Sequence, residues 1–522
     1  MKQIRYIIKA TLLSAAIACT SCDDWFSIYP ESEMVYEDFW ADKNDVFSML
    51  GSCYRGMIEP GFMERLIVWG ELRSDNIVAG PNLSAGDDLQ YLLEANVTSS
   101  NGYASWSDFY KVINYCNTLI LYAPDVKDKD PNFTQEELDM YLAEAKAVRA
   151  FCYFTLVRTF RDVPYITEPY TDDTQNFYIA QTSPDRLVNT LIADLEACVD
   201  DANDRFPQLT YTKGRFTKNG IRALIADMAL WQGDYQKCVQ YCDDVLTDTK
   251  NFLALEPYSK YNYNVFIAGN STESIFELQF IQENIPNYVV NEFYGRSGSG
   301  STRNTYQKLS AYDLCQDNAN SLFGETDVRK YDAFFKSGSA AMIPIQKYVA
   351  MRTESATGTV RESDYTIVSN SKNWVVYRLS DIYLMKAEAL ATIGTDLQGA
   401  LDMVSKTYDR ANPTLNAGSL QLSSYNTPDA MRKLVLDERQ REFIFEGKRY
   451  FDLIRLARYE KSTENIVSNY LLRKYGNLDQ STTKSKLNTM DAIYMPISAD
   501  ELKLNSLLVQ NPFYDISSDV TK

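Results

Sequence analysis

The chain has 522 residues, of which 45% are hydrophobic and 23% are charged, and its formal net charge is -18. This composition excludes a disordered chain and predicts a large buried core, and the acidic surface disfavours nucleic acid because it repels a phosphate backbone. The chain contains no histidine, which excludes Ser-His-Asp and Cys-His catalysis, HExxH zinc sites and imidazole general bases.

The first 21 residues have the form of a secretory signal. Basic residues at positions 2, 5 and 9 precede the apolar run ATLLSAAIA, which is too short to span a bilayer as a stop-transfer helix. Residues 19–22, CTSC, have the form of a lipoprotein cleavage box. We therefore expect Cys22 to be the acylated first residue of the mature protein, anchored by its acyl chains. An ordinary signal peptide and a periplasmic protein are the alternative.

Helical periodicity dominates the region up to residue 250. Thr134 and Glu137 form a capping box ahead of a helix predicted over residues 138–160. Residues 218–231 and 235–246 form a helix pair whose turn contains Gly233-Asp234-Tyr235. Such a pair is similar to a tetratricopeptide unit.

A second pair, residues 377–393 and 397–410, repeats this form. We expect about four such pairs, stacked into one curved scaffold, because a helix pair cannot bury its faces alone. The predicted fold class is therefore mostly α, with tetratricopeptide-like helical pairs.

Residues 251–373 differ from the helical regions. They are rich in Asn, Ser, Gly and Tyr and contain short strand-like runs, such as SIFELQF at 274–280 and IPIQKYVAM at 343–351. Irregular segments on a rigid scaffold are where binding sites usually lie. We therefore expect ligand identity to be determined in this loop-rich region.

The C-terminal part contains the most unusual stretch, residues 434–455. Thr427-Pro428-Asp429 predicts a helix start, and the helical pattern continues through Gly447 to Arg455. A glycine inside a helix costs about 1 kcal/mol relative to alanine, so we expect a second helix packed closely against it.

The same stretch carries three glutamates, Glu438, Glu442 and Glu446, at one helical turn from each other and interleaved with arginines. Apolar residues occupy much of the remaining circumference, so some of these ions are predicted to be buried and paired. We interpret the row as a salt-bridge lattice. A pair of catalytic carboxylates is the alternative.

The segment ERQREFIFEGKRYFDLIR, residues 438–455, resembles the signature helix of the SusD/RagB family, the surface lipoproteins of Bacteroidetes that capture nutrients for outer-membrane transporters. Residues 71–76, ELRSDN, match another segment of that family, and the ends YMPI (494–497) and QNPFY (510–514) resemble its PIP and QNPGY motifs, with Phe513 in place of the glycine.

The resemblance implies a non-catalytic protein without cofactor or metal. It would be lipid-anchored at the outer surface of the outer membrane and would deliver its ligand to a SusC-like TonB-dependent transporter. Its parts would be a signal peptide (1–21), a helical N-terminal region (22–250), the loop-rich region (251–373) and the C-terminal region (374–522), with 251–522 forming the C-terminal half of one globular unit.

The expected ligand is an oligosaccharide. Aromatic residues make up 13% of the chain, with 37 tyrosines, and the C–H faces of sugar rings stack on aromatic planes. Residues 75–103 and 284–306 combine aromatic and polar side chains, and glycan-binding members of the family carry aromatic loops at about these places. The side chains that we select for ligand contact are Asp75, Asn76, Tyr91, Tyr288, Phe293, Tyr294 and Arg296.

Two other functions remain open at this point. RagB-like members share the signature and bind peptides, which requires backbone hydrogen bonds more than stacking rings. A carboxylate-based glycosidase would need two acids about 5–10 Å apart across a cleft; no motif indicates one.

Overall fold

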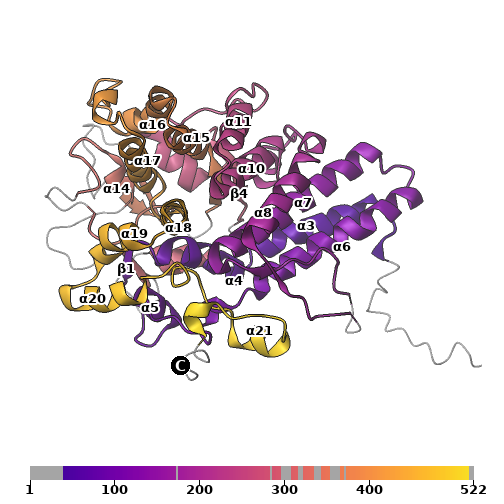
Figure 1. The fold of residues 1–522 in the computed structure, drawn as a ribbon. Coiled ribbons are helices and arrows are strands. Elements are labelled where there is room, and N and C mark those ends of the chain that lie inside the picture. The colour runs from indigo at the N-terminus through magenta and orange to yellow at the C-terminus, as the bar shows by residue number, and fades with distance from the viewer. Residues whose placement is uncertain are drawn as a thin grey trace, which may run out of the picture.

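The computed structural model describes residues 39–171, 175–281, 285–295, 307–314, 321–333, 343–352, 365–368 and 372–515. Helices dominate, as the sequence predicts (Figure 1). The helices of the N-terminal half are α3 (Lys43–Met57), α4 (Pro60–Ile67), α5 (Asp88–Leu93), α6 (Ser107–Lys129), α7 (Gln135–Phe160), α8 (Pro184–Glu196), α9 (Leu209–Gly214), α10 (Lys218–Gln232) and α11 (Tyr235–Leu246).

Among the described residues of the second half, helices longer than seven residues begin at Leu379. Its helices are α12 (Tyr258–Tyr261), α13 (Tyr288–Tyr294), α14 (Arg329–Ala333), α15 (Leu379–Ile393), α16 (Leu397–Ala411), α17 (Pro428–Phe443), α18 (Arg449–Glu460), α19 (Glu464–Asn469), α20 (Asn477–Lys486) and α21 (Ala499–Leu504). Among the described residues, no helix combines the length and the apolar character needed to cross a bilayer.

The helices pack in a continuous series. Contacts run from α3 and α6 through α7, α8, α10 and α11 to α15, α16 and α17, and Figure 1 shows the two ends of this series at opposite sides of the molecule. The predicted pairs at 218–246 and 377–410 are the antiparallel neighbours α10–α11 and α15–α16. The mostly α, helical-pair fold is therefore confirmed.

Local sequence signals explain why these helices begin and end where they do. The hydroxyl of Thr134 accepts from the backbone N–H of Glu137, and the Glu137 carboxylate accepts from Thr134 in return, so the predicted capping box is present. Gly233 ends α10 in the left-handed conformation, with φ of 80°. A glycine adopts that conformation without steric cost, which allows the tight turn into α11.

Strands are short and form four antiparallel pairs in the described part of the chain. Two of the pairs link distant segments of the sequence. The pairs are β1 (Ile77–Ala79) with β5 (Leu309–Ala311), β2 (Val163–Pro164) with β3 (Gln181–Thr182), β4 (Ser274–Leu278) with β8 (Trp374–Arg378), and β6 (Ala350–Arg352) with β7 (Tyr365–Ile367).

The predicted continuous helix at 434–455 is wrong. The structure has two helices, α17 and α18, separated at residues 444–448, where Phe445 and Gly447 have φ of 64° and 72°. Gly447 therefore serves a turn rather than a helix face. Its close neighbour is Gly70 in the π-helical segment Val68–Leu72: a Cβ at Gly70 would lie 1.8 Å from the Gly447 carbonyl oxygen.

Candidate ligand site

The pairing of β1 with β5 joins the first stretch that the sequence selects, residues 75–103, to residues that lie just after the second, residues 284–306. Ile77 is opposite Ala311 and Ala79 is opposite Leu309, and the Gly80 N–H donates to the carbonyl of Lys308 at 2.8 Å. The helix α5 follows β1 in the chain and α13 precedes β5. Residues more than 200 positions apart therefore form one site region, which we call the β1–β5 site and define by α5, α13 and the two strands.

Asp75 and Asn76 lie beneath this region and are fully buried. Both oxygens of the Asp75 carboxylate accept from the Arg449 guanidinium, at 2.9 and 3.1 Å. Burial by itself raises the pKa of Asp75, but the Arg449 charge outweighs it and the pKa is lowered from its ordinary value. The Asn76 side-chain amide donates to Glu71 at 2.6 Å and accepts from Gln440 at 2.7 Å. Both side chains are therefore occupied by buried protein partners, which indicates a supporting role.

Glu71 connects this segment to the turn between α17 and α18. Its carboxylate accepts from the backbone N–H groups of Phe445 and Gly447, each at 3.1 Å. These donors have no helical partner because the helix is broken there, and the carboxylate replaces the missing carbonyl groups. Burial raises the pKa of Glu71 to about 7.

The selected aromatic side chains divide into two groups. Tyr91 on α5 and Tyr288 on α13 are 40% and 60% exposed, so both rings are open to a ligand. Phe293 and Tyr294 are buried, and the Tyr294 hydroxyl donates to the carbonyl of Phe445 at 3.3 Å. The expected ligand contact by Phe293 and Tyr294 is therefore not supported, because α13 turns this face into the core.

Two of the expected functional residues lie outside the described residues. They are Arg296, selected for ligand contact, and Cys22, selected for the lipid anchor.

The structure adds polar side chains that the sequence did not single out. Lys308 pairs with Glu292 of α13 at 2.5 Å, and the Tyr103 hydroxyl donates to Glu64 of α4 at 3.4 Å. Burial and the charge of Glu292 both raise the pKa of Glu64. No sequence signal marks Glu64, since a single acid on a short amphipathic helix is typical of a solvated face.

Behind the β1–β5 site, the glutamates of the signature stretch form a buried ion network. Arg378 donates to Glu273, Glu442 and Glu446 at 2.6, 2.6 and 2.9 Å. Arg410 also pairs with Glu442, and Arg329 binds the same carboxylate at 2.9 Å. The predicted salt-bridge lattice is present.

The same network provides a hydrogen-bond donor for main-chain carbonyl groups at the C-terminal end of α17. Lys347 Nζ donates to the carbonyls of Glu442 and Ile444 at 3.0 Å and to the Glu446 carboxylate at 2.6 Å. Burial would raise the pKa of Glu446, but the charges of Arg378, Lys347 and Lys448 lower it to about 2. A carboxylate held ionised in this way cannot donate a proton at neutral pH, so it does not fit the role of a general acid.

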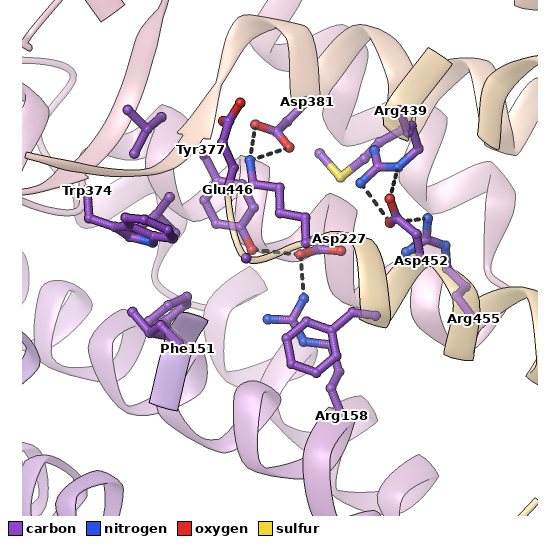
Figure 2. A pocket seen from close by; sticks show the side chains of 17 residues that line it. Phe151, Arg158, Asp227, Trp374, Tyr377, Asp381, Arg439, Glu446, Asp452 and Arg455 are labelled. Atoms are coloured by element: carbon purple, nitrogen blue, oxygen red, sulfur yellow. Dashed lines mark hydrogen bonds and ion pairs between the residues drawn. The ribbon is translucent and has the colours of Figure 1, made fainter. Parts of the chain in front are cut away.

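A small cavity of about 50 Å³ lies beside the network (Figure 2). Arg158 and the Tyr377 hydroxyl both bond to Asp227, at 3.3 and 2.9 Å, and Arg439 pairs with Asp452 at 2.9 Å. The space suits a buried water molecule and is too small for a sugar ring. This cavity is part of the scaffold and not a binding site.

Comparison with known proteins places these features in a family. The model of the SusD family matches residues 316–514, and a second model, described as starch-binding associating with outer membrane, matches residues 83–263. SusD-like protein P38 of Formosa agariphila is 24% identical over 496 residues, covering 87% of this chain and 92% of its own. SusD-like protein P2 of the same organism is 25% identical over 537 residues, covering 97% of this chain and 99% of its own.

Solved structures share the fold. A SusD superfamily protein from Bacteroides vulgatus superposes with a TM-score of 0.71 at 21% identity, covering 91% of this chain and 99% of its own. Surface glycan-binding protein A from Bacteroides uniformis superposes with a TM-score of 0.68 at 22% identity, covering 90% of this chain and 100% of its own. The resemblance to the SusD/RagB family that the sequence predicts is therefore confirmed over residues 83–263 and 316–514.

Proposed function

We propose that this protein binds oligosaccharides at the β1–β5 site without cleaving them. The observation that carries the proposal is the strand pairing that sets the exposed rings of Tyr91 and Tyr288 on two short helices beside one antiparallel pair. The buried Asp75–Arg449 pair holds the segment ahead of β1, and the Tyr294 hydroxyl ties α13 to the carbonyl of Phe445. Little conformational entropy should therefore be lost when a ligand binds. The description of the family model matching residues 83–263, and the glycan-binding relative from Bacteroides uniformis, support a carbohydrate ligand.

The same proposal includes delivery to a transporter. The mature protein is anchored to the outer membrane by acylated Cys22, faces the outside of the cell and passes its ligand to a SusC-like TonB-dependent transporter. The leader pattern at residues 1–22 and the outer-membrane wording of the family description support this location. Replacing Cys22 by serine should move the protein from the membrane fraction to the soluble fraction. Membrane retention of the Cys22→Ser variant would count against the anchor.

The experiment that tests the binding function uses the mature chain with panels of oligosaccharides and short peptides. We expect calorimetry to detect a saccharide, and chromatography after long incubation to recover that saccharide intact. Release of shorter saccharides would show a glycosidase. Binding of peptides alone would show the RagB-like alternative.

A further inference from the structure

A second concave surface shares no lining residue with the β1–β5 site. It is a cleft of about 550 Å³ between α6, the segments 164–170 and 177–179, and α21; Figure 1 labels both helices. We call it the α6–α21 cleft. Its volume falls in the range of small-molecule sites.

Aromatic rings line one side of this cleft. Tyr170 and Phe177 are stacked, with ring centroids 4.8 Å apart and planes inclined by 24°. Phe177 is 47% exposed and its neighbour Tyr178 is 53% exposed. Adjacent exposed rings at the wall of a concave surface are typical of a binding site rather than of a solvated face.

Hydrogen bonds hold these rings in place. Asn114 of α6 accepts from the Tyr170 N–H at 2.7 Å and donates to its carbonyl at 3.1 Å. The Tyr170 hydroxyl donates to the carbonyl of Asn176 at 3.0 Å, and the Asn176 side chain accepts from the Tyr178 N–H at 2.9 Å. The aromatic wall is therefore preorganised, which reduces the entropy lost on binding.

Two charged side chains line the cleft. Lys111 on α6 and Glu501 on α21 contribute one charge of each sign. Burial raises the pKa of Glu501, and the Trp106 side chain hydrogen-bonds to its carboxylate. Lys111 is already paired with Glu59 at 3.1 Å. The cleft therefore has no cluster of charges of one sign beside its flat apolar rings, which favours a neutral ligand with hydroxyl groups over an anion or a cation.

Three main-chain carbonyl groups at the cleft are already engaged. Tyr110 donates to the carbonyl of Pro164 at 2.6 Å, Tyr153 to that of Ile166 at 2.8 Å, and Asn505 to that of Ile179 at 2.8 Å. An extended peptide needs free backbone donors and acceptors to add as a strand. These carbonyls therefore do not offer an edge for a peptide, whereas the ring faces remain open to a sugar.

We propose that the α6–α21 cleft is a second carbohydrate site, which takes a neutral oligosaccharide and stacks its rings on Phe177 and Tyr178. The inference goes beyond the proposed function, because it requires neither Tyr91 nor Tyr288. It predicts that the protein holds a glycan at two separate places, so a longer polymer is retained more firmly than a short one through effective concentration.

The test is calorimetry of the mature protein with neutral glucan, mannan, xylan and galactan oligosaccharides at millimolar concentration. The Phe177→Ala/Tyr178→Ala variant should lose one binding event or weaken it about tenfold, the size expected for lost stacking. The Tyr91→Ala/Tyr288→Ala variant should keep that event. The matched control is Tyr263→Ala, since Tyr263 is 49% exposed and does not line the cleft.

Each outcome decides the proposal. Both altered side chains are about half exposed, so the double variant should fold, and circular dichroism checks this. If the double variant does not fold, the single Tyr178→Ala variant replaces it in the test. Unchanged binding in both cleft variants overturns the second site and leaves the β1–β5 site standing. The second site is also refuted if no neutral saccharide binds, or if the cleft variants affect only peptide binding.

Discussion

Asp75 and Arg449 lie 374 positions apart in the sequence and form a fully buried ion pair with contacts of 2.9 and 3.1 Å. The pair joins the segment that leads into β1 to the first turn of α18. It therefore connects the base of the β1–β5 site to the signature stretch of the family, and it explains why a polar segment of the sequence lies in the core.

The first prediction concerns this pair. Asp75→Ala should lower the free energy of unfolding by about 3–5 kcal/mol, because Arg449 would remain buried without a partner. Urea unfolding followed by circular dichroism measures the change. The control is Asp500→Ala. The Asp500–Lys503 pair is exposed, so its loss should change the free energy of unfolding by less than about 1 kcal/mol. Equal effects of the two substitutions would refute the supporting role of Asp75.

A second prediction concerns the contact between Gly70 and the turn at Gly447. Gly70→Ala should destabilise the protein by about 1–3 kcal/mol or more, because its Cβ would lie 1.8 Å from the Gly447 carbonyl oxygen. Gly51→Ala is the matched control: it is in helix α3, and a Cβ there meets nothing within 4 Å. Alanine is a better helix former, so this control should stabilise by up to about 1 kcal/mol. Thermal unfolding of both variants tests the contrast, and a neutral Gly70→Ala would contradict it.

A third prediction concerns pH. Burial raises the pKa of Glu71 from 4.5 to about 7, so the folded state binds the proton more tightly than the unfolded chain. Its contribution to stability is complete below pH 4.5 and is lost as the pH rises through 7. The loss amounts to roughly 3 kcal/mol. Glu71→Gln removes the titration, so the stability difference between wild type and variant should change by that amount over this range. Denaturant midpoints at several pH values measure it, and parallel curves would be the contrary result.

The helical scaffold was predictable because its signals are local. The periodicity and turn residues of 218–246 predict α10 and α11 to within one residue of the observed bounds. The start of α17 at Pro428 also follows from neighbours alone: the Thr427 hydroxyl accepts from the Ala430 N–H. Each of these features is determined within a few residues along the chain.

The site was predictable only in part because its determinants are distant in sequence. The sequence around Asp75 and Asn76 is typical of an exposed loop. Only their contacts with Arg449 and Gln440 show that the two side chains are buried. The break after α17 likewise depends on Glu71, which provides acceptors for the Phe445 and Gly447 N–H groups. Tyr91 and Tyr288 remain the predicted ligand contacts.

The central claim is that exposed aromatic rings beside the β1–β5 pair hold a saccharide. The most direct measurement is the calorimetric affinity for a bound oligosaccharide in Tyr91→Ala and Tyr288→Ala, each made in a Phe177→Ala/Tyr178→Ala background so that the α6–α21 cleft contributes little. Each substitution should weaken binding by more than about 1 kcal/mol, while Tyr263→Ala in the same background leaves it unchanged. Undiminished affinity in both tyrosine variants would contradict the account.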